Sequence, residues 1–86
     1  MEVRLHPDVQ GYLDKLEDSD TDRCEESLKM LGDEPFRSRP KWDIKKLKGR
    51  DKTMYRLRVG DHRFEYFVEE DKVWIVEAFR RGRGYR

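Results

Sequence analysis

The feature that most constrains this 86-residue chain is a two-residue break in the segment YRLRVGDHRFEYFV, residues 55–68. Apolar and charged residues alternate on both sides of Gly60-Asp61, as in two half-buried strands joined by a tight turn. Glycine in the first loop position suits a type II′ turn, in which that residue needs a positive φ. Because a two-residue loop fixes how its strands pair, the sequence predicts a β-hairpin of defined register.

The predicted register divides the hairpin side chains between two faces. It places Val59 opposite His62 and Arg58 opposite Arg63, which is a destabilising like-charge pair unless negative charge lies close to it. One face receives the apolar side chains of Tyr55, Leu57, Phe64, Tyr66 and Val68. The other face receives Arg56, Arg58, Arg63 and Glu65.

The three arginines on one face have two explanations. Arginine is a planar, permanently charged fork suited to bidentate phosphate contact, so the cluster is typical of an anion site. Alternatively, Glu65 and nearby acids neutralise the arginines, and the face is an ordinary solvated surface. The pattern leaves both explanations open.

The net charge of +1 conceals a large difference between the two parts of the chain. Residues 1–36 contain 4 basic residues against 11 acids, a net charge of −7. Residues 37–86 contain 16 basic residues against 8 acids, a net charge of +8. A basic region of this size is typical of a polyanion site, although a solvated charged surface would explain the charge content equally well.

The remaining segments predict one α+β domain over residues 1–86. Pro7 suits the first position of a helix, and Ser19 is a candidate cap for a second helix that ends at Gly32. Strand patterns occur at 3–5, 44–49, 54–60, 62–68 and 72–79. We expect the N-terminal strand and helix pair to pack on one face of a twisted, mostly antiparallel sheet of four to five strands.

Other kinds of site find little support in the sequence. The single cysteine, Cys24, excludes an internal disulfide and falls on the apolar stripe of the second helix, which indicates a core residue rather than a nucleophile. His6 and His62 lack a ligand spacing, so we expect no metal and no cofactor. Without a signal peptide or an apolar run of membrane-spanning length, the protein is expected to be cytoplasmic, with no membrane partner.

The last eight residues, FRRGRGYR at 79–86, extend the basic character of the hairpin. Arginines interleaved with an aromatic residue suit single-stranded nucleic acid, because they offer charge to phosphates and a flat surface to a base. The alternative is a frayed basic terminus. Trp42 lies in a basic loop and is compatible with base stacking or packing, whereas Trp74 in a central strand indicates packing.

Together these motifs resemble the RelE/ParE toxin superfamily, and RelE-type mRNA interferases most closely. The resemblance spans nearly the whole chain and rests on KLKG at 46–49, on the arginine-bearing hairpin and on the closing R-R-x-R-x-Y. Members like RelE cut mRNA in the ribosomal decoding site by attack of a ribose 2′-hydroxyl on the adjacent phosphodiester, without a metal. ParE-like members instead inhibit DNA gyrase.

The resemblance implies roles for residues at matching positions. Basic residues of the sheet stabilise the scissile phosphate, and a tail tyrosine orients or stacks on the substrate. The implied catalytic residues are Arg56, Arg58, Arg63, Arg80 or Arg81, and Tyr85. The implied RNA-binding residues are Lys46, Lys48, Arg83 and Arg86. The implied partners are a cognate antitoxin, the ribosome and mRNA.

One departure from the family pattern affects the chemistry. The best-known RelE pattern has lysines where this chain has Arg56 and Arg58, and an arginine effectively cannot accept a proton. Glu65 is the nearest titratable candidate for a base, since alternation points His62 to the other face. Otherwise the arginines act by electrostatic stabilisation alone. A ParE-like gyrase inhibitor and a binding-only relative are the alternatives to a nuclease.

Overall fold

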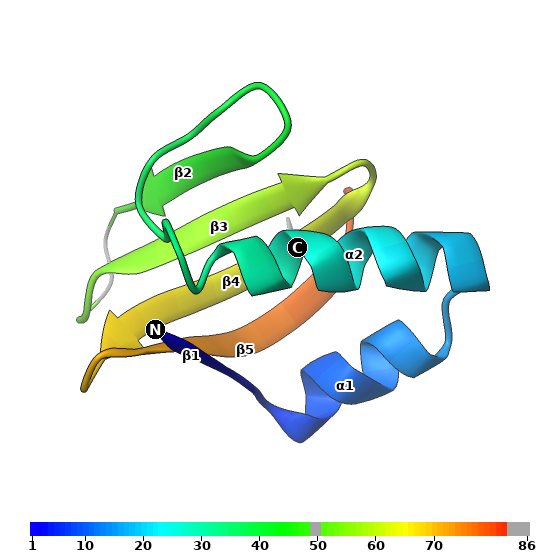
Figure 1. Cartoon of the computed structure of the whole chain (residues 1–86), viewed down its shortest axis with the longest axis horizontal. Coiled ribbons are helices and arrows are strands. Elements are labelled where there is room, and N and C mark those ends of the chain that lie inside the picture. The colour runs from blue at the N-terminus through cyan, green and yellow to red at the C-terminus, as the bar shows by residue number, and fades with distance from the viewer. Residues whose placement is uncertain (49–50, 83–86) are drawn as a thin grey trace.

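The computed structural model describes residues 1–48 and 51–82, and it contains two helices and five strands in these residues. In chain order the elements are β1 (Glu2–Leu5), α1 (Pro7–Asp14), α2 (Asp18–Met30), β2 (Asp43–Leu47), β3 (Met54–Val59), β4 (His62–Glu69) and β5 (Lys72–Arg80). The strands form one sheet in the order β1-β5-β4-β3-β2, in which β1 runs parallel to β5 and all other pairs are antiparallel. Both helices lie on the same side of this sheet (Figure 1). The predicted α+β architecture, with the helix pair on one face of the sheet, is confirmed, but the N-terminal strand β1 is an edge strand of that sheet rather than packed on its face.

The start of α1 follows from a proline and a side-chain cap, and the start of α2 is favoured by acidic residues in its first turn. Pro7 begins α1 as expected, and Nδ1 of His6 accepts a hydrogen bond from the Asp8 backbone N–H. The expected cap of α2 was wrong, because Ser19 lies inside the helix and Glu17 is its N-cap, without a side-chain cap hydrogen bond. Acidic side chains in the first turn of α2 instead stabilise the helix by interacting with the positive end of its dipole.

The predicted hairpin register is confirmed at every pair from Val59–His62 to Tyr55–Tyr66. Gly60 has a φ of +59°, and Asp61 has no positive φ, as the type II′ turn requires. Leu57, Phe64 and Tyr66 are fully buried beneath the helices. The arginine-bearing face is therefore the face that the helices leave uncovered.

The core lies between this sheet and the two helices. Val9 and Leu13 of α1 and Leu28 of α2 pack against the buried residues of the sheet. Ile75 and Val73, in β5, are also fully buried, as expected of a strand with neighbours on both sides. Within residues 1–48 and 51–82, no helix combines the length and apolar character needed to cross a membrane.

Replacement of Gly60 by alanine should destabilise the protein, because alanine pays a steric cost at positive φ. We expect the free energy of unfolding to fall by about 1–2 kcal/mol. The matched control is Gly11→Ala in α1, where an added Cβ would meet no atom within 4 Å. Alanine should there raise the free energy of unfolding by about 0.5–1 kcal/mol. Urea unfolding measures both, and equal effects at the two glycines would contradict the turn assignment.

Cys24 should be unreactive in the folded protein. Burial raises the pKa of its thiol to about 11, and the nearby carboxylates of Asp20 and Glu25 act in the same direction. Very little thiolate is then present at pH 8, and the sulfur is shielded from solvent. We expect iodoacetamide at pH 8 to leave Cys24 unmodified until urea unfolds the chain. Mass spectrometry of the treated protein measures the alkylation. Rapid alkylation under native conditions would show that Cys24 is not a core residue.

Candidate nucleic-acid interface

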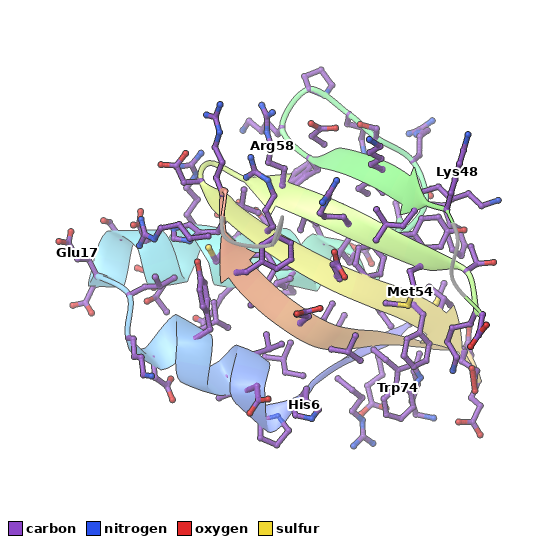
Figure 2. All side chains as sticks on the ribbon, turned by 180° about the vertical axis from the view of Figure 1, so that it is seen from behind. His6, Glu17, Lys48, Met54, Arg58 and Trp74 are labelled. Atoms are coloured by element: carbon purple, nitrogen blue, oxygen red, sulfur yellow. The ribbon has the colours of Figure 1, made fainter. Side chains whose placement is uncertain are left out.

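The face of the sheet without helices carries a group of charged side chains at the end nearest the β3–β4 turn (Figure 2). We call these residues the open-face cluster. Arg56 of β3 lies opposite Lys45 on one side and Glu65 on the other, and Arg58 lies between Asp43 and Arg63. The cluster comprises Asp43, Lys45, Arg56, Arg58, Arg63 and Glu65.

Five of these side chains surround a shallow cavity of about 200 Å³. Four of them are cationic, and only Asp43 is acidic. The Asp43 carboxylate lies 3.7 Å from Nε of Arg58, with both side chains more than half exposed. Such an exposed ion pair contributes at most about 1 kcal/mol and leaves the cavity positively charged. A small anion with several oxygen atoms matches this lining.

Arg63 explains how the protein tolerates the like-charge pair with Arg58. The Arg63 side chain is 8% exposed, and its Nη1 donates to the carbonyl oxygen of Gly60 at 2.8 Å and to that of His62 at 3.2 Å. The negative ends of two backbone dipoles thus lie against its guanidinium group. Together with Asp43, these carbonyls offset the repulsion within the protein. The like-charge pair alone is therefore weaker support for a ligand than the sequence suggested.

Glu65 is also buried, at 6% exposed, although it lies on the face without helices. Its Cα partners are Arg56 on β3 and Glu77 on β5. A carboxylate this far from water requires cationic or hydrogen-bonding neighbours to stay ionised. The position next to Arg56 provides one such neighbour. Glu65 is thus part of the cluster rather than an isolated acid in solvent.

The two lysines expected to bind RNA do not lie in the open-face cluster. Lys46 lies opposite Tyr55, on the helix side of the sheet, so it is not in the open-face cluster. Lys48 follows β2 at the end of the sheet far from Arg58 (Figure 2). Lys45 lines the charged cavity in their place. Sequence reasoning missed Lys45 because its face depends on the β2–β3 register, which no short turn fixes.

The two candidate late arginines are also separated. A β-bulge at Glu65/Tyr66 reverses the alternation in β5, and Arg80 consequently lies opposite His62, on the helix side. The backbone N–H of Arg81 donates to the carbonyl of Asp61 at 2.7 Å, which places Arg81 beside the hairpin turn. The predicted tail residues Arg83, Tyr85 and Arg86 lie outside the described residues.

His62 points away from the cluster, as expected. It is 5% exposed, and its Nδ1 lies 2.7 Å from the hydroxyl of Tyr12 in α1. Its Nε2 lies 3.6 Å from Oδ2 of Asp20 in α2. This imidazole joins the β3–β4 turn to both helices and cannot reach a ligand on the other face.

The tryptophans and possible metal ligands add nothing to the cluster. Trp74 stacks on Phe67 with ring centroids 6.3 Å apart, far from Arg58 along the same face (Figure 2). Trp42 donates from Nε1 to Oγ of Ser27 and packs against the core on the helix side. In the part of the chain that the structure describes, no three acidic, histidine or cysteine side chains form a potential metal site.

Comparison with known proteins agrees with this fold. No protein-family model and no curated protein matches the chain. The archaeal RelE–RelB complex from Pyrococcus horikoshii OT3 contains a chain with 33% identity and a TM-score of 0.81, over 95% of this chain and 96% of that one. The RelB–RelE antitoxin–toxin complex from Methanococcus jannaschii shares the fold, with 21% identity and a TM-score of 0.71 over 90% and 88% of the two chains. The identity and coverage of the first match establish that this chain belongs to the RelE toxin family.

Proposed function

We propose that this protein is the toxin of a type II toxin–antitoxin system and that it cleaves mRNA in the ribosomal decoding site. The observation that carries the proposal is the convergence of Arg56, Arg58 and Arg63 on one solvent-open cavity in a RelE-family chain. The cavity offers planar, permanently charged donors at a site large enough for a phosphate group. Its openness to solvent suits a substrate that is held in place by a much larger assembly.

In the proposed step the ribose 2′-hydroxyl gives its proton to a general base, for which Glu65 is the candidate in this protein. Its oxygen attacks the adjacent phosphorus, the bond from phosphorus to the 5′ oxygen breaks, and this oxygen takes up a proton from water. Negative charge grows on the phosphate oxygens during this attack, and fixed guanidinium groups stabilise it. Arg63 is held by two carbonyls before substrate arrives, whereas the exposed Arg58 is positioned to contact the phosphate directly.

The positions of the other predicted residues change some of their proposed roles. Lys45 replaces Lys46 as a basic neighbour of the phosphate, because it lines the cavity. Arg81, beside the hairpin turn, fits the late arginine better than Arg80 on the helix side. Tyr85 retains its proposed role in orienting or stacking on the RNA.

The partner that keeps such a toxin inactive is proposed to be a cognate antitoxin. Both structural neighbours named above are complexes of a RelE protein with RelB. An acidic or amphipathic antitoxin segment would complement the positive cavity and exclude RNA from it. The proposed site of action, the ribosome, places the protein in the cytoplasm.

A gyrase inhibitor is the second candidate function. It requires no cavity with convergent cations, so the geometry of the open-face cluster favours the nuclease. A DNA supercoiling assay separates the two functions. Binding without catalysis is distinguished by intact mRNA after incubation with translating ribosomes.

Arg58→Ala and Arg63→Ala should each reduce mRNA cleavage by about 100-fold or more, because each removes a donor to the phosphorane. Purified protein is added to translating ribosomes, and primer extension maps the cuts within codons. Lys15→Ala, which removes an exposed cation from the helix side, is the matched control and should cut normally. Prior mixing with antitoxin should protect the mRNA. Intact mRNA with the unmodified protein, together with inhibited supercoiling, would reject the nuclease in favour of the gyrase inhibitor.

Glu65→Gln tests whether Glu65 is the general base. The amide keeps the shape of the side chain but cannot accept the proton, so cleavage should fall by about 100-fold or more. Affinity for uncleavable 2′-O-methyl RNA should change little. A loss below tenfold, with a lower melting temperature, would instead identify Glu65 as a structural counter-ion and place the base on the ribosome.

A further inference from the structure

A second cavity lies on the helix side of the sheet, at the same end as the open-face cluster. It has a volume of about 390 Å³ and lies between α2, the segment before β2 and the end of β3. Nothing in the proposed cleavage chemistry uses it. Its lining consists of Arg23, Glu26, Ser27, Pro40, Lys41, Trp42 and Val59.

The two cavities meet at the ends of β2 and β3. Trp42 lines the second cavity, and its neighbour Asp43 lines the cavity of the open-face cluster. Likewise, Val59 lines the second cavity and its neighbour Arg58 lines the first. Successive residues of a strand point to opposite faces, so only the thickness of the sheet edge separates the two sites. A flexible strand that leaves one site at this edge reaches the other directly.

The hairpin turn brings a cation from each site to one residue. Nη1 of Arg63 donates to the Gly60 carbonyl, and Nη1 of Arg23 lies 3.2 Å from the point where a Cβ on Gly60 would be. The guanidinium groups of α2 and β4 thus approach the same glycine. Since residues 1–36 carry a net charge of −7, Arg23 is an exception in an acidic region. Guanidinium groups from the two cavities therefore lie on either side of the turn, which also carries the exposed acid Asp61.

The aromatic wall of the second cavity is held rigidly. The indole N–H of Trp42 donates to Oγ of Ser27 at 3.2 Å, and this hydroxyl donates to the carbonyl of Arg23 at 3.0 Å. Arg39 and Trp42 exchange two backbone hydrogen bonds of 2.9 Å, and the Arg39 guanidinium lies 5.3 Å from the Trp42 ring centroid. An indole fixed in this way presents a surface to a ligand at little entropic cost.

The lining matches the parts of a nucleotide. Trp42 and Pro40 offer apolar surface to a base, and Arg23 and Lys41 offer charge to a phosphate. The Glu26 carboxylate disfavours a phosphate in its own part of the cavity but accepts hydrogen bonds from base N–H groups. We propose that this cavity binds a nucleotide of the same RNA strand whose phosphate lies in the open-face cluster. The inference rests on the proposed function for the identity of that strand.

The test uses a 2′-O-methyl RNA hexamer, which lacks the attacking hydroxyl and stays intact. Trp74→Phe leaves Trp42 as the only tryptophan, so its fluorescence reports on the second cavity. Saturable quenching is expected as the hexamer binds. In this background, Arg23→Gln with Lys41→Ala should weaken binding at least fivefold and reduce the salt dependence by about 0.7 for each lost phosphate contact. Lys29→Ala, another exposed cation of α2, is the control and should leave affinity unchanged.

The outcomes separate this inference from the proposed function. Hexamer binding that depends on Arg58 but leaves Trp42 fluorescence and the double variant unaffected would overturn the second site alone. Quenching and weaker binding by the double variant, without ribosomal cleavage, would support an RNA site and reject the nuclease. If the double variant binds RNA normally but loses affinity for antitoxin, the cavity is a protein-binding site and the inference is wrong.

Discussion

The two-residue turn at Gly60-Asp61 is the constraint on which the rest of this structure depends. Side chains in a strand alternate, so a slip of one residue would expose Phe64 and Tyr66 and place Arg63 and Glu65 under the helices. Burial of uncompensated charges costs several kcal/mol for each ion, which a domain of this size cannot offset. The turn therefore sets the apolar core and the charged face by the same geometric choice. A change in the hairpin register would therefore alter the core and the charged face together.

Two residues of the open-face cluster are much less exposed than Asp43, Lys45 and Arg58. Arg63 and Glu65 are nearly as buried as core residues, yet they lie on the side without helices. The carbonyls of Gly60 and His62 accept hydrogen bonds from Arg63, and Arg56 is the strand partner of Glu65. Groups held in this way need little rearrangement when charge develops nearby, which is the property that electrostatic catalysis requires. Arg58, which lies opposite Arg63, is instead exposed and pairs with Asp43.

The sequence was sufficient for the fold and for most of the cluster, because the short loop and the alternating pattern specify one pairing. It was insufficient for Lys46, since six residues connect β2 to β3 and leave that register free. Arg80 was ambiguous for another reason. β5 is apolar on both faces, so its pattern does not reveal the bulge that reverses the last residues. The start of α2 was misplaced at Ser19 because several polar residues there suit a helix N-terminus equally well.

The parallel pairing of β1 with β5 has a consequence for the order in which this protein is made. β1 is synthesised first, but its hydrogen-bonding partner is the last strand, Lys72–Arg80. The apolar faces of both helices therefore have no complete sheet to pack against until most of the chain has left the ribosome. Contacts this distant in sequence also slow folding once synthesis has reached them. The complete sheet, and any activity that needs it, exists only after β5 has emerged.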